Sequence, residues 1–131
     1  MSWESVEQAL RHTHAATPRE GGGLELRRAD AVVVIRPVEV EARPWVEISI
    51  TIAPRAEVNL ATALLHNFEL PIGALVVAGD SVVLAQTLPL DGLDPANLDE
   101  AIEFLAGKTA ELRATVVIAK TAGADDYANT F

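Results

Sequence analysis

Two histidines, His12 and His14, are the residues whose type and spacing first suggest metal chemistry in this sequence. Imidazole nitrogen is a common zinc ligand. The surrounding pattern predicts a helix, however, and residues two apart on a helix do not share a face. No third ligand lies nearby, so we interpret both histidines as solvent-exposed polar residues. His66, which follows Leu65, is interpreted as an edge or interface residue rather than a base.

Nucleophilic and phosphate-binding chemistry would need motifs that the sequence does not contain. Ser49 and Thr51 fall on the polar face of a predicted strand, and no Gly-x-Ser-x-Gly elbow is present. The run Gly21-Gly22-Gly23 precedes a predicted strand and lacks the Lys-Ser or Lys-Thr of a phosphate loop, so we interpret it as a hinge. The first helix, which precedes this hinge, is then expected to be only lightly tethered to the rest of the domain. The chain has no cysteine, which excludes disulfides, thiolate zinc sites and a cysteine nucleophile.

Acidic residues crowd together after residue 90, where Asp91, Asp94, Asp99 and Glu100 could hold a cation weakly. They lack the alternating spacing of a calcium loop. Asp94 stands directly before Pro95, which is the pattern of a helix cap with proline at the first helical position. We therefore predict no metal, no cofactor and no catalytic residue, and hence no enzyme.

The composition describes one aliphatic domain. The chain has 131 residues and a mass of 13.9 kDa, is 50% apolar and only 5% aromatic, which suits a core of Val, Leu, Ile and Ala. We predict a single α+β domain over residues 1-120 and a flexible acidic tail over 121-131, which contains Asp125 and Asp126. The N-terminus does not resemble a signal peptide, and no apolar run is long enough to span a membrane, so we expect a cytoplasmic protein.

The formal net charge is -9, and residues 57 to 131 carry eleven acidic against three basic side chains. An acidic protein repels phosphate backbones and anionic lipid head groups. Nucleic acid and membranes are therefore not expected as partners, whereas a basic or amphipathic protein would suit this charge. The alternative is that the charge only keeps a small protein soluble.

The elements that position these residues follow from periodicity and from Gly and Pro punctuation. One helix is expected from Ser2, its cap, to about Ala15, and a clear strand follows Pro44, with Val46, Ile48, Ile50 and Ile52 on one side. Such alternation is typical of an antiparallel sheet with one buried face. The complete prediction is helices over 2–15, 56–68 and 95–117, and strands over 24–28, 31–40, 45–52, 74–78 and 81–88. The order is α-β-β-β-α-β-β-α, with helices packed on the sheet.

The second predicted helix carries an apolar stripe that is wider than one sheet face requires, formed by Leu60, Ala61, Leu64, Leu65 and Phe68. One interpretation is the interface of a homodimer. The other is an ordinary core helix covered on two sides by the sheet and the third helix.

Three arginines, Arg27, Arg36 and Arg43, fall in the strand region among glutamates and near Trp45. One interpretation is a solvated sheet face with cross-strand ion pairs. The other is a mixed-charge surface that recognises an extended segment of a partner protein beside Trp45.

The stretches Leu64–Val77 and Val82–Leu90, together with the element order, resemble the class I chaperones of type III secretion and their YbjN-like relatives. The shared features are a helix that ends in Leu-Leu, Asn67, a link with Gly73 that opens a strand, and the exit Leu88-Pro89-Leu90. The resemblance implies a homodimer joined through the second helix and a nearby strand. It also implies that the sheet and the first helix hold an extended segment of a client protein.

Two alternatives to a chaperone-like module stay open at this point. One is a YbjN-like regulatory or scaffolding domain that has no secretion client. The other is a small-ligand-binding α+β domain with a pocket between sheet and helices.

Overall fold

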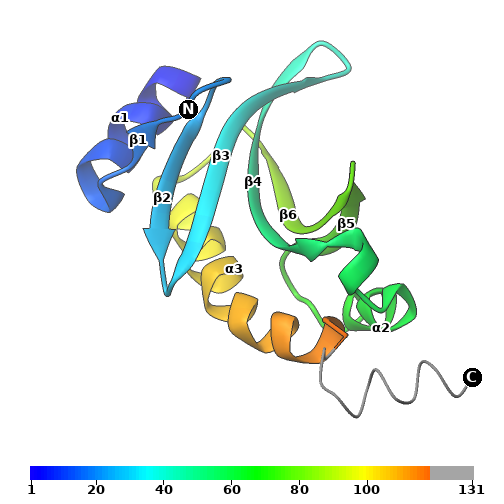
Figure 1. Ribbon diagram of the computed structural model, residues 1–131. Helices are drawn as coiled ribbons and strands as arrows, with labels where there is room; N and C mark the ends of the chain where they lie inside the picture. Colours follow the sequence, from blue (N-terminus) through cyan, green and yellow to red (C-terminus); the bar gives the residue numbers. More distant parts are fainter. Residues whose placement is uncertain (119–131) are drawn as a thin grey trace, which may run out of the picture.

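The computed structural model describes residues 1–118, which form one antiparallel sheet and three α-helices (Figure 1). The strand order is β1-β2-β3-β4-β6-β5, and every neighbouring pair is antiparallel. The elements are α1 (Trp3–His14), β1 (Thr17–Pro18), β2 (Leu24–Arg28), β3 (Ala31–Val40), β4 (Arg43–Pro54), the 3-10 turn η1 (Arg55–Glu57), α2 (Leu60–His66), β5 (Ala74–Ala78), β6 (Ser81–Pro89) and α3 (Pro95–Val116). The predicted α+β class and antiparallel sheet are confirmed. The predicted boundary at residue 120 and the tail lie outside the described residues.

The sheet has one strand more than the sequence predicts, because β1 is only two residues long and has no periodicity to detect. Ala15 adopts a left-handed conformation at the end of α1, and the N–H of Ala16 donates to the carbonyl of Leu10. This reversal of the chain lays Thr17 and Pro18 antiparallel to the start of β2.

The core lies between the sheet and the helices on one of its faces. Six buried residues at helical spacing form the inner face of α3: Leu98, Ile102, Leu105, Thr109, Leu112 and Val116. Opposite them lie the inward residues of β3, β4 and β6, among which Ile35, Ile48, Ile50 and Leu84 are fully buried. Aliphatic side chains thus supply the core, as the composition indicates.

α1 is packed against the rest of the domain, and the prediction that it is only lightly tethered is wrong. Val6 and Leu10 are fully buried in the common core. His14, predicted to be exposed, has a side chain that is only 6% exposed, with Nε2 2.8 Å from a carboxylate oxygen of Asp99 on α3. His12 is exposed as predicted. The contact with Asp99, far away in the sequence, distinguishes His14 from His12. The local sequence pattern gives no sign of this contact.

α2 begins four residues later than predicted. The side chain of Asn59 accepts a hydrogen bond from the backbone N–H of Thr62, which makes Asn59 the N-cap. Val58 before it is extended and buried, and it pairs with Val117 after α3. The 3-10 turn η1 occupies the remainder of the predicted first turn.

The β3–β4 hairpin extends beyond the rest of the sheet. Pairing of β2 with β3 stops at Leu24 and Ile35, whereas β3 and β4 stay paired to Val40 and Arg43. Pro37 is paired with Val46 of β4 at a point where β3 has this single neighbour, and proline is tolerated there. The end of this hairpin lies near the start of α1, and α2 lies at the other end of the molecule (Figure 1).

Candidate protein-binding surfaces

The apolar stripe of α2 lies on the surface of the described chain. Leu64, Leu65 and Phe68 are 65%, 67% and 91% exposed, and Leu60 and Ala61 are exposed as well. Ala63 is the one buried residue of this helix. The interpretation of α2 as a core helix covered on two sides is therefore wrong for this stripe. All five predicted interface residues are left uncovered within residues 1–118.

Strand β5 continues this apolar surface, and the sequence did not indicate its part in it. β5 is the last strand of the sheet formed by residues 1–118, so one of its edges has no neighbour within this range. Val76 and Val77 on it are 42% and 48% exposed. A shallow hollow of about 340 Å³ separates β5 from α2 and is lined by Leu60, Ala63, Leu64, Leu75, Val76, Val77 and Val82. We call α2 and β5 together the α2–β5 surface. The part formed by β5 could not be predicted, because local sequence patterns do not give the order of the strands in the sheet.

The predicted arginine surface lies on the sheet face opposite the core, which we call the open face. Arg36 on β3 donates to Glu47 on β4 at 2.7 Å, directly across the strand pair. On the same face of β4, the next side chains toward the hairpin turn are Trp45, opposite Val38, and then Arg43, opposite Val40. Arg27 lies apart from them, near the β2–β3 turn. The structure thus brings three of the four predicted residues together.

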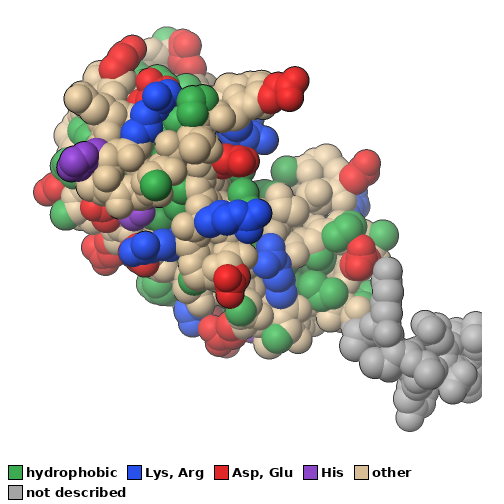
Figure 2. Space-filling model, turned by 60° about the vertical axis from the view of Figure 1, so that its left-hand side comes forward, with side chains coloured by type: hydrophobic (Ala, Val, Ile, Leu, Met, Phe, Trp, Pro, Cys, Tyr) green, Lys and Arg blue, Asp and Glu red, His purple; other side chains and the backbone are tan. Residues whose placement is uncertain are grey.

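Basic and acidic side chains are interspersed on the side of the molecule that Figure 2 presents. Arg43 lies 4.0 Å from Asp91, and both side chains are largely exposed. Such surface pairs contribute only about 0–1 kcal/mol. These arginines can therefore exchange their present partners for charges on another molecule at low cost.

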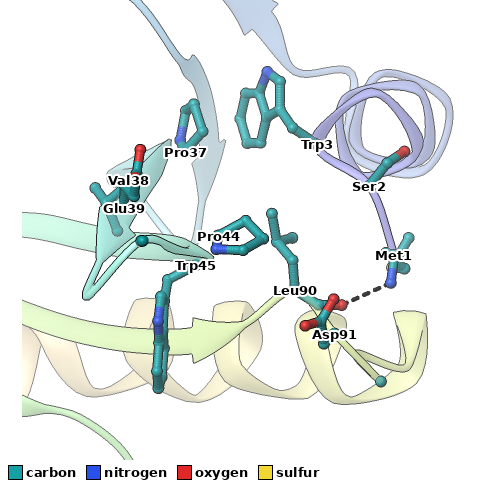
Figure 3. A pocket seen from close by; sticks show the side chains of 12 residues that line it. Met1, Ser2, Trp3, Pro37, Val38, Glu39, Pro44, Trp45, Leu90 and Asp91 are labelled. Atoms are coloured by element: carbon teal, nitrogen blue, oxygen red, sulfur yellow. Dashed lines mark hydrogen bonds between the residues drawn. The ribbon is translucent and has the colours of Figure 1, made fainter.

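A third surface is a hollow of about 950 Å³ between the start of α1, the β3–β4 hairpin and the chain after β6. Its lining includes Trp3, Pro37, Pro44, Trp45 and Leu90. In Figure 3, Trp3 reaches toward Pro37, and the ring of Trp45 lies on the far side of Pro44 from Trp3. We call it the tryptophan hollow. The sequence analysis missed it because its walls come from three distant segments, although the concentration of Trp and Pro around residue 45 was a visible sign.

Metal and membrane sites were also considered in the described part of the chain. Residues 1–118 contain no group of three His, Asp or Glu side chains placed to hold a metal ion. None of the helices in this range has the length and hydropathy needed to cross a bilayer.

No family model and no curated protein sequence matches the chain. Solved structures do match it. One chain in the structure of the HopA1-SchA chaperone-effector complex has a TM-score of 0.60, with 83% of this chain and 90% of that chain covered, at 14% sequence identity. YbjN from E. coli, a candidate transcription regulator, has a TM-score of 0.57, with 91% and 97% covered, at 16% identity. This chain has the fold of these proteins. The fold implied by the sequence resemblance is thereby confirmed.

Within this chaperone-like fold, the residues that carry the resemblance hold α2 against β5. The amide of Asn67 forms two hydrogen bonds with the backbone of Leu75, at 2.7 and 3.1 Å. Gln86 accepts from the N–H of Gly73 at 2.7 Å. Gly73 has a φ of +81°, and a Cβ there would lie 2.7 Å from Leu105, so glycine is required. These contacts fix the geometry of the α2–β5 surface.

Proposed function

We propose that the protein is a non-catalytic protein-binding module that acts as a homodimer and holds an extended segment of a partner protein. The observation that carries the proposal is the α2–β5 surface, an exposed apolar surface at the place through which the sequence resemblance implies dimerisation. Leu64, Leu65 and Phe68 give it the large side chains that anchor interfaces. The fold, which occurs in a chaperone-effector complex, supports the same proposal. A chain without cysteine suits the reducing cytoplasm in which we place it.

Dimerisation is expected to be visible in the wild-type protein as a molar mass of twice 13.9 kDa by light scattering. A two-fold axis would bring α2 and β5 of one protomer against the same elements of its partner, so each apolar contact occurs twice in the interface. A mass of 13.9 kDa at all accessible concentrations would overturn the dimer.

The partner segment is proposed to lie across the open face, where Arg27, Arg36 and Arg43 favour acidic residues spaced between apolar ones. Selection from a displayed library of unstructured segments is expected to enrich such sequences. The double variant Arg27→Glu/Arg43→Glu should lower the apparent affinity of the selected segments about tenfold, because two attractive contacts become repulsive. The matched control Arg11→Glu/Arg55→Glu changes the charge equally on α1 and η1 and should leave binding unchanged. Enrichment of no segment by the wild type would count against partner binding at this face.

A second candidate function is a regulatory or scaffolding domain that binds a protein but has no secretion client. The match to YbjN, which covers more of this chain than the other match does, is the observation that favours it. Both candidates use the same surfaces. They differ in the partner, so identification of a bound protein from cells, verified with the purified pair, would separate them.

A further inference from the structure

The tryptophan hollow has the shape and chemistry of a site for a polypeptide rather than for an enclosed small molecule. Flat, rigid rings line it: Trp3 from α1, and Pro37 and Pro44 from the hairpin, whereas the ring of Trp45 lies beyond Pro44 at its border. Leu90, which is buried, closes its floor. Its volume of about 950 Å³ is open to solvent along the surface, so a chain can enter and leave it. Grooves lined by aromatic rings are the recognised binding mode for polyproline II helices.

The charge of the hollow selects among such segments. Glu39 and Asp91 belong to its lining, whereas the cation of the lining is the α-ammonium of Met1, which donates to the carbonyl of Leu90 at 2.7 Å, so two carboxylates stand against one cation. The neighbouring Arg43 reaches Asp91 only at 4.0 Å, with both side chains largely exposed, so a ligand cation can compete for this carboxylate. The protein as a whole carries a net charge of -9, which adds a long-range attraction for basic partners.

We propose that the tryptophan hollow binds a proline-rich segment that carries arginine or lysine. This inference rests on the proposed protein-binding role and gives the chemistry of a second segment site. The site lies at the hairpin end of the molecule, away from the α2–β5 surface (Figure 1). Dimerisation and binding at this hollow can therefore succeed or fail separately.

Trp3 lines the hollow, and a Trp45→Phe variant keeps Trp3 as its one tryptophan, so the emission of this variant reports on the hollow and not on the open face. The probe is a synthetic peptide of prolines with an arginine at every third position. We expect saturable emission changes, with an affinity about tenfold higher than for a Gly/Ser peptide with the same arginines, because proline preorganises the ligand. A matched peptide with glutamate in place of arginine should bind about tenfold more weakly at low salt.

Variants of the protein complete the test. Glu39→Lys/Asp91→Lys should weaken binding of the arginine peptide about tenfold and improve binding of the glutamate peptide. The control Glu69→Lys/Asp80→Lys makes the same change in net charge near α2 and β5 and should have little effect. Trp3→Ala should abolish binding, as measured by titration calorimetry; if that variant fails to fold, the charge variants decide.

Absence of binding by the arginine peptide to a wild-type protein that is a dimer would overturn this inference and leave the dimer standing. Equal affinities for the proline-rich and Gly/Ser peptides would also overturn it, since the hollow would then not select polyproline II. Equal losses in the two charge variants would mean that overall charge, and not the hollow, attracts the peptide.

Discussion

Leu64→Glu is expected to convert the dimer into folded monomers. In a single chain the Leu64 side chain is already 65% exposed, so a charge at this position has little effect on the stability of the protomer. In a two-fold dimer the same substitution places two carboxylates in an apolar interface, where each unpaired charge is costly. A loss of about 3 kcal/mol raises the dissociation constant on the order of a hundredfold. Light scattering across a dilution series measures this change directly.

A control for this experiment is Val40→Glu, which places the same charge on another exposed aliphatic residue. Val40 is 46% exposed and lies at the end of the β3–β4 hairpin, away from α2 (Figure 1). We expect Val40→Glu to keep the wild-type molar mass. Circular dichroism should show that both variants keep the secondary structure of the wild type. Dissociation by Val40→Glu but not by Leu64→Glu would place the interface elsewhere than on the α2–β5 surface.

Local patterns were sufficient for most of the fold because each element here has a strong period of its own. The alternation from Val46 to Ile52 predicts β4, and the inner face of α3 follows from residues three and four apart. Gly79-Asp80 between two β-branched runs predicts the hairpin of β5 and β6, which the pairing of Ala78 with Ser81 confirms. The hydrophobic core was predictable for the same reason.

Features that depend on contacts between distant residues were not predictable in this way. The burial of His14 depends on Asp99, 85 residues away in the sequence. The late start of α2 depends on the pairing of Val58 with Val117, which holds Val58 in an extended conformation. Strand β1 exists only because α1 returns the chain to β2.

The candidate sites also differ in whether they lie within one segment of the sequence or join distant segments. Four of the five stripe residues lie within α2 and Phe68 follows in the turn directly after it, so all five could be named from local periodicity. Its extension onto Val76 and Val77 requires the knowledge that β5 ends the sheet. The tryptophan hollow joins residues near positions 3, 45 and 90, and only the folded chain brings these segments together.

Gly23→Ala is expected to be among the most destabilising single-methyl changes in the protein, and Gly21→Ala provides its matched control. Both glycines lie in one loop with positive φ, +78° and +90°, so both substitutions meet the left-handed penalty of about 1 kcal/mol. A Cβ at Gly21 would contact nothing within 4 Å, whereas one at Gly23 would lie 2.6 Å from the carbonyl oxygen of Ile35. That carbonyl belongs to a central strand, where Ile35 is paired with Leu24 and Ile48, so it cannot move away without disturbing the sheet.

We therefore expect Gly23→Ala to lower the free energy of unfolding by about 3 kcal/mol or more and Gly21→Ala by about 1 kcal/mol. Urea unfolding of both variants in the Leu64→Glu background measures the difference, because unfolding of a monomer does not depend on protein concentration. Equal losses would mean that the loop can shift as a unit and that the Gly21-Gly22-Gly23 run is the hinge that its composition predicts. A larger loss at Gly23 would instead show that the last of the three glycines is fixed by its contact with β3, which locks the connection between α1 and the sheet.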